Sequence, residues 1–157
     1  MRLYLARHGE ALPKHIDPQA PLSDTGRWEA ETIAGFLADS HVRYEAIFHS
    51  GKTRARQTAE IFAQTAAEGP KPEQLDSIDP MDPPEHLLPT IAGWRQNTLV
   101  VGHNPFMGHL LGLLLGGHGA PALAEFSTCS VACLQRGSAG VWTLRWMVSP
   151  ELFLGRG

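Results

Sequence analysis

The sequence has little cysteine, little net charge and no long apolar run. Two of its 157 residues are cysteines, too few for the disulfide framework of a small secreted domain. With 13 lysines and arginines against 16 aspartates and glutamates, we expect no surface built for nucleic acid or an acidic membrane. The most apolar stretch, residues 106–115, is about half the ~20 residues of a membrane-spanning helix.

The first residues and the two cysteines favour a cytoplasmic protein. The apolar run after Arg2 ends at Arg7, which is too short for the core of a secretory leader. Cys129 and Cys133 lie in one predicted strand, where four residues separate them by about 13 Å, beyond the roughly 7 Å that a disulfide spans. In a helix the two would instead be neighbours. The strand assignment predicts two reduced, buried thiols.

Short apolar strands alternate with helices along the chain. The expected strands are residues 2–6, 46–49, 98–101, 130–135 and 141–148. The expected helices are residues 24–38, 52–67, 85–94 and 105–115, and residues 69–84 are mostly loop, with a short strand near Leu75. Because strands joined by crossover helices pair in parallel, this order predicts a three-layer α/β/α sandwich with a mostly parallel sheet. The length suits one domain over residues 1–157.

Helix ends and faces can also be predicted. The helix over 24–38 is expected to begin at Ser23 or Asp24 and to bury one apolar face, made of Ala30, Ile33, Phe36 and Leu37. The helix over 52–67 has a similar stripe, made of Ala55, Ala59, Phe62 and Ala66. Asn104 followed by Pro105 is a strong start signal for the last helix.

Cationic and imidazole side chains follow three of the predicted strands. Arg7 and His8 come after the first strand, Arg54 enters the helix after the second, and His103 follows the third. Ligands of such sheets collect at the carboxyl ends of the strands. Helix amino termini there add unpaired N–H groups, and arginine binds oxyanions through two parallel hydrogen bonds. The pattern predicts an anion pocket sized for a phosphoryl group.

Five motifs, in order and spanning nearly the whole chain, carry a resemblance to a known family. They are Leu5–Ala11, Pro21–Gly26, Ser50–Thr58, Val100–Pro105 and Trp146–Pro150. With them the sequence resembles the histidine phosphatases related to phosphoglycerate mutase, and among these the short bacterial phosphohistidine phosphatases of the SixA type. The resemblance implies a phosphoglycerate-mutase-like fold without a large lid insertion.

The resemblance also implies roles for the residues at the strand ends. His8 is the expected nucleophile, which becomes phosphohistidine. The residues expected to bind and polarise the phosphoryl group or to line its site are Arg7, Gly9, Arg54, His103 and Asn104. An imidazole attacks only when neutral, and two nearby guanidinium groups would lower its pKa. Since the cluster itself neutralises the phosphoryl charge, no metal or other cofactor is expected.

The sequence departs from the family pattern at the general acid. Larger relatives supply a carboxylate from a loop after the second helix, and Ser77 stands at the aligned position here. Asp76 and Asp79 are candidate substitutes, with Asp82 as a third. The imidazole of phosphohistidine, with an ordinary pKa near 6.5, leaves without such an acid more readily than an alkoxide.

A second departure concerns a basic residue. SixA-type proteins often carry one just before the Pro21–Leu22 pair, where this chain has Ala20. Lys14, His15 or Lys52 could supply that charge instead.

Three functions follow from these observations. The first is a phosphatase that acts on a phosphorylated histidine of a partner protein, such as a phosphotransfer domain. The second is a phosphatase for a small phosphoester, and the third is a phospho-ligand binding module with weak turnover. The missing acid and the short interval over residues 68–97, which leaves the site open, favour the first.

Overall fold

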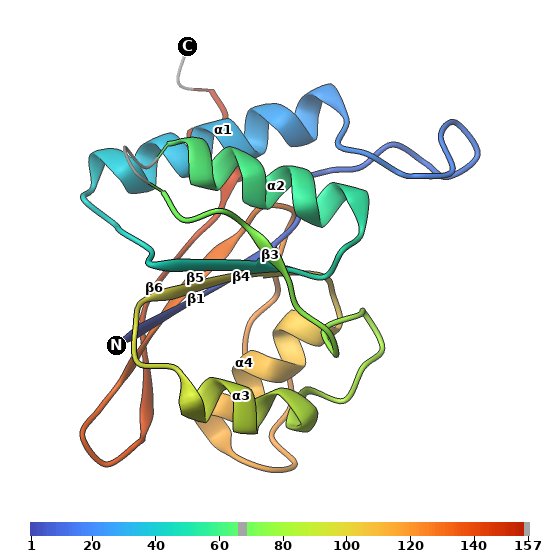
Figure 1. Cartoon of the computed structure of the whole chain (residues 1–157). Helices are drawn as coiled ribbons and strands as arrows, with labels where there is room; N and C mark the ends of the chain where they lie inside the picture. Colours follow the sequence, from blue (N-terminus) through green and yellow to red (C-terminus); the bar gives the residue numbers. More distant parts are fainter. Residues whose placement is uncertain (66–68, 156–157) are drawn as a thin grey trace.

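The computed structural model describes residues 1–65 and 69–155 and has three layers (Figure 1). Helices α1 (Asp24–Asp39) and α2 (Thr53–Gln64) cover one face of the sheet. Helices α3 (Leu88–Gly93) and α4 (Phe106–Gly116) cover the other, with the 3₁₀ turn η1 (Pro84–Leu87) beside them. The predicted α/β/α sandwich is confirmed.

The sheet has six strands in the order β3-β2-β4-β1-β5-β6. The strands are β1 (Arg2–Arg7), β2 (Ala46–His49), β3 (Glu73–Gln74), β4 (Thr98–Gly102), β5 (Val131–Arg136) and β6 (Trp142–Val148). β4 pairs in parallel with β1 and with β2, and β2 pairs in parallel with β3. β5 pairs antiparallel with β1 and with β6. Three of the five pairings in the described structure are parallel, so the sheet is mostly parallel, as predicted.

Strand β4 lies between two hydrophobic cores. Leu99 and Val101 pack into the core under α1 and α2, whereas Val100 packs into the core formed with α3 and α4. Every residue of β4 is buried, because successive side chains of a strand point to opposite faces and both faces are covered. The central position predicted for this strand is confirmed.

Two predicted helix details are wrong. Phe36, expected on the buried face of α1, is 43% exposed, because it lies at the edge of the molecule with its ring against Phe153, 5.2 Å between centroids. The helix expected over 85–94 is split into η1 and α3. Pro89 sits in the first turn of α3, where its missing N–H is tolerated, but it cannot continue a helix from upstream.

The ends of α2 and α4 also differ from expectation. α2 begins at Thr53 and ends at Gln64, with Thr65 as its C-cap residue, so it is shorter at both ends than the predicted 52–67. Residues 66–67 of that prediction, with Ala66, lie outside the described residues. α4 begins at Phe106 with Pro105 as its N-cap residue. Asn104 does not cap it, because its side chain donates a hydrogen bond elsewhere, to the Phe126 carbonyl.

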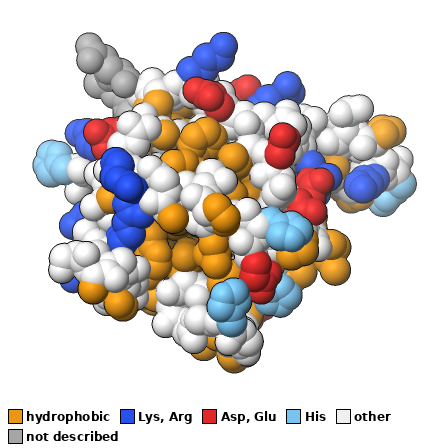
Figure 2. Space-filling model, turned by 60° about the horizontal axis from the view of Figure 1, so that its bottom comes forward, with side chains coloured by type: hydrophobic (Ala, Val, Ile, Leu, Met, Phe, Trp, Pro, Cys, Tyr) orange, Lys and Arg blue, Asp and Glu red, His pale blue; other side chains and the backbone are white. Residues whose placement is uncertain are grey.

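The surface turned forward in Figure 2 mixes side chains of every kind. Positive and negative side chains are interspersed among apolar ones on this face, which lies over α3 and α4 (Figures 1 and 2). Within residues 1–65 and 69–155, no helix is both long and apolar enough to cross a bilayer.

Candidate active site

Parallel pairing brings three strand ends to one edge of the sheet. Arg7 of β1 lies opposite Gly102 of β4, and His49 of β2 lies opposite Val101. The residues just beyond these pairs, His8 and His103 among them, therefore leave the sheet at nearly the same level. The predicted convergence of cationic and imidazole groups at this edge is what the sheet register produces.

His8 is held with one ring nitrogen facing Arg54. Its Nδ1 lies 2.7 Å from the Gly9 carbonyl oxygen. Because a carbonyl can only accept, Nδ1 carries the proton and Nε2 keeps its lone pair. Nε2 accepts a hydrogen bond of 3.3 Å from Arg54 Nε. The side chain is 8% exposed, so a neutral, fixed imidazole presents Nε2 to the guanidinium group.

Burial keeps both histidines of the cluster neutral. It lowers the pKa of His8 to about 4; the Gly9 carbonyl opposes this shift, and Arg54 and Arg7 add to it. Burial likewise lowers the pKa of His103 to about 3, with smaller contributions from His8 and the nearby cations. The sequence predicts that the two arginines keep the His8 imidazole neutral. The structure assigns the larger part to the removal of the ring from water.

His103 stands beside His8 and bonds a residue that the sequence analysis did not single out. The two ring centroids are 4.9 Å apart. His103 Nε2 lies 2.6 Å from the hydroxyl of Ser50, which directly follows β2. Nδ1 of His103 is buried and has no hydrogen-bond partner within the described part of the chain. The position of Ser50 could have predicted it, because Ser50 directly follows β2 just as His8 directly follows β1 and His103 directly follows β4.

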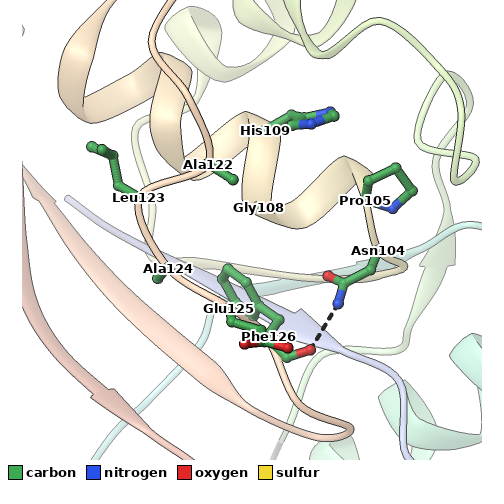
Figure 3. Close-up of a pocket in the computed structure, with 9 residues that line it drawn as sticks. All are labelled: Asn104, Pro105, Gly108, His109, Ala122, Leu123, Ala124, Glu125 and Phe126. Carbon is green, nitrogen blue, oxygen red and sulfur yellow. Dashed lines mark hydrogen bonds between the residues drawn. The ribbon is translucent and has the colours of Figure 1, made fainter.

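Arg7 is anchored by a carbonyl that it shares with Asn104. Its NH1 group donates to the Phe126 carbonyl at 2.9 Å, and Asn104 Nδ2 donates to the same oxygen at 2.8 Å, the dashed line in Figure 3. Nε of Arg7 is buried without a hydrogen-bond partner among residues 1–65 and 69–155. Asn104 thus holds the carbonyl that positions Arg7, and its predicted place in the substrate site stays a prediction. Asn104 and Phe126 also line a cavity of about 420 Å³.

Gly9, expected to line the phosphoryl site, packs closely against α1 and is tied to α2. Its N–H donates to Thr58 Oγ1 at 3.1 Å, and Thr58 Oγ1 in turn donates to the Arg54 carbonyl at 2.8 Å. Its φ lies outside the left-handed region, but a Cβ here would lie 2.5 Å from the carbonyl oxygen of Gly26. Glycine is therefore required by close approach to α1.

Glu29 ties the two loops around the site together, and no sequence signal marked it. Its carboxylate accepts from the Glu10 N–H at 2.8 Å and from Thr128 Oγ1 at 2.7 Å. The next residue, Cys129, donates its N–H to the His8 carbonyl at 3.1 Å. Burial lowers the pKa of Arg7, and the Glu29 carboxylate opposes that shift. On a helix face, a half-buried glutamate of this kind looks like any solvated residue.

Of the three candidate acids, Asp79 lies nearest to the cationic cluster. Its Oδ1 is 3.3 Å from Lys52 Nζ, and both residues line a cavity of about 520 Å³ together with Arg54. Asp82 accepts a hydrogen bond of 2.8 Å from the Asp79 N–H. Asp76 is exposed at the end of β3. Asp82 lines the same cavity, and of these two carboxylates Asp79 is the one paired with a cation in the described structure.

The two low pKa values predict a specific titration. Unfolded histidine binds a proton near pH 6.5, whereas His8 binds one only near pH 4. Between these values the unfolded chain binds more protons, so stability falls as the pH falls, by roughly 3 kcal/mol for His8 alone. We expect NMR titration of labelled histidine to show the imidazoles of His8 and His103 neutral at pH 5, with the His8 signal absent from His8→Asn. Protonation of both rings near pH 6.5 would contradict this arrangement.

Comparison with known proteins agrees with this geometry. The model of the histidine phosphatase superfamily (branch 1) matches residues 3–82. Phosphohistidine phosphatase SixA of Escherichia coli (strain K12) is 27% identical over 155 residues, covering 96% of this chain and 94% of that protein. A protein of Picosynechococcus sp. is 34% identical over 116 residues, covering 69% of each chain.

Solved structures share the whole architecture. The structure of the protein histidine phosphatase SixA complexed with tungstate matches with a TM-score of 0.83 and 26% identity, over 98% of this chain and 99% of that one. The phosphoglycerate-mutase-like fold predicted from the motifs is confirmed. Because the family model covers about half of the chain and the similarity to SixA covers nearly all of it, the chain belongs to the histidine phosphatase superfamily and is a phosphatase.

Proposed function

We propose that residues 1–157 form a single domain that hydrolyses phosphohistidine on a partner protein, through a phosphorylated His8. The observation that carries the proposal is the pose of His8. Its protonated Nδ1 is bound to a carbonyl, and its unprotonated Nε2 accepts a hydrogen bond of 3.3 Å from Arg54 Nε. This is a neutral nucleophile already facing a group that can hold a phosphoryl oxygen.

The reaction has two steps in this site. Nε2 of His8 attacks phosphorus, a new P–N bond forms, the P–N bond of the substrate breaks, and the leaving imidazole takes a proton from solvent. Water then attacks the phosphorus on His8, a P–O bond forms, the P–N bond to Nε2 breaks, and the proton lost by the water goes to the released inorganic phosphate or to solvent, which restores the neutral ring. Arg7, Arg54 and His103 bind the phosphoryl oxygens and stabilise their charge in both steps.

Three observations favour phosphohistidine as the substrate. The Asp79 carboxylate is paired with Lys52 and is not free to act as a general acid. This disfavours substrates whose leaving group requires an acid and favours an imidazole leaving group. Between the described end of α2 and β4 lie a two-residue strand and two short helical segments, which leaves the site open to a side chain on another protein. The relatives named SixA are a phosphohistidine phosphatase and a structure holding tungstate, a tetrahedral oxyanion like phosphate.

The free cysteines support a place in the cytoplasm. Cys129 and Cys133 are both buried and unbridged in the described structure, which suits a reducing compartment. The partner would then be a cytoplasmic phosphoprotein, such as a phosphotransfer domain that carries phosphohistidine.

Substrate preference tests the proposal. We expect kcat/KM for a phosphohistidine-bearing protein to exceed that for a sugar phosphate by at least about tenfold, which is ~1.4 kcal/mol of barrier. The imidazole leaves without a strong acid, whereas an alkoxide does not. Release of inorganic phosphate from each substrate at matched concentrations measures the ratio.

The other outcomes identify the alternatives. A preference for the sugar phosphate would assign the protein to small phosphoesters. Binding of both phosphorylated compounds with turnover of neither would make it a phospho-ligand binding module.

A further inference from the structure

Lys52 and Asp79 form an ion pair at the mouth of the candidate site. Lys52 is the N-cap residue of α2, two positions before Arg54. Its Nζ lies 3.3 Å from Asp79 Oδ1, with the two side chains 36% and 56% exposed. Both line the cavity of about 520 Å³ that also contains Arg54. The pair therefore lies where a phosphorylated side chain would enter.

The charges of Lys52 and Asp79 act on the Arg–His cluster, which is made of Arg7, His8, Arg54 and His103. Lys52 is among the cations that add to the low pKa of His103, after burial, His8 and Arg54. Burial and Arg7 lower the pKa of Arg54, and the Asp79 carboxylate opposes them. In the absence of substrate, the Asp79 carboxylate thus partly neutralises the positive charge of the site.

Such a pair is easily exchanged. Ion pairs between exposed side chains contribute about 0–1 kcal/mol, and the lysine ammonium sits on a flexible four-carbon stem. A phosphoryl dianion held by Arg7 and Arg54 offers Lys52 more charge than one carboxylate does. The phosphoryl dianion is therefore expected to displace the Asp79 carboxylate from the Lys52 ammonium group.

We propose that Lys52 is a phosphoryl-binding residue and that Asp79 is the counter-ion which holds it until an oxyanion arrives. This inference rests on the proposed function, since it assumes that the phosphoryl group binds at the Arg–His cluster. It assigns to Lys52 the basic contact that Ala20 cannot supply, and it makes Asp79 a competitor of the substrate instead of its proton donor.

Binding of tungstate to variants tests the inference. We expect Lys52→Met to weaken the Kd by about fivefold to tenfold and Asp79→Asn to tighten it by about threefold, at constant ionic strength. Lys71→Met, an equal charge change at an exposed lysine before β3, should leave the Kd within about twofold. Calorimetry gives the Kd, and unchanged melting temperatures show that each variant is folded.

A double variant separates direct competition from a general field effect. If Asp79 acts by holding Lys52, adding Asp79→Asn to Lys52→Met should change the Kd by less than about twofold. Equal Kd values in all variants, or shifts of the same sign in both single variants, would overturn the inference. So would a fall in kcat in Asp79→Asn that grows with the leaving-group pKa at unchanged Kd, because that is the signature of a general acid.

Failure here and failure of the proposed function look different. Tungstate binding does not depend on which phosphorylated substrate is preferred. Opposite shifts in an enzyme that prefers sugar phosphates would keep the role of Lys52 and refute the phosphohistidine proposal. Equal tungstate Kd values in all variants of an enzyme that prefers phosphohistidine would refute the role of Lys52 and keep the phosphohistidine proposal.

Discussion

Replacing His8 by asparagine is expected to lower kcat by at least about 10⁴-fold, because it removes the nitrogen that forms the bond to phosphorus. Asparagine fits the space and retains an N–H donor for the Gly9 carbonyl, so the loop should keep its shape. Binding of tungstate should survive, since the arginines remain. Steady-state turnover of a phosphohistidine protein and the Kd of the anion measure the two effects separately.

The matched control is His118→Ala, an exposed histidine beyond α4, which should leave kcat unchanged. Equal thermal stability of His8→Asn and the wild type shows that lost turnover is not lost folding. Turnover within about tenfold of the wild type in His8→Asn would mean that water attacks the substrate directly, and the covalent route would be wrong.

Gly26→Ala is expected to have the largest effect on stability. A Cβ at this first-turn position of α1 would lie 1.9 Å from the Glu10 carbonyl oxygen and 2.7 Å from the Glu10 nitrogen. Both obstacles are backbone, so the helix and the loop after β1 must move apart. We expect a loss of about 3 kcal/mol, or a fall in Tm of roughly 6–12 °C for a chain of this size.

Gly35→Ala, in the same helix, should act in the opposite direction. Apart from its chain neighbours and the nearby backbone of its own helix, no atom of the described residues lies within 4 Å of the Cβ position at Gly35. Alanine therefore adds no clash and removes the backbone entropy cost of a helical glycine. Stability should rise by about 0.5–1 kcal/mol. Denaturant unfolding of both variants gives the comparison, and destabilisation of equal size would contradict the contact at Gly26.

The sequence pattern located the site because the fold obeys a general rule. Carboxyl ends of parallel strands meet at one edge of a sheet, so residues placed just after each predicted strand had to converge. His8, Arg54 and His103 do converge, with the contacts given above. Finding them required correct strand ends, and the apolar runs marked those ends well.

Contacts that depend on three-dimensional packing were not predictable in this way. Asn104 has the residue type of a helix cap, and only the approach of the loop containing Phe126 diverts its amide to a carbonyl. Glu29 bridges two loops that are far apart in sequence. Phe36 fits the apolar period of α1, yet its ring lies against Phe153 and the residue is 43% exposed. Periodicity gives the face of a helix and not the extent of the surface that covers it.

The position of the phosphoryl group in the trapped enzyme tests the central claim most directly. Mixing the protein with a labelled phosphohistidine protein, quenching in alkali and examining the product by phosphorus and nitrogen NMR shows which atom is phosphorylated. Phosphate on Nε2 of His8, stable in alkali and labile in acid, is the predicted result, because Nδ1 is bound to the Gly9 carbonyl. Phosphate on Nδ1, on another residue, or on none while turnover proceeds would contradict the account.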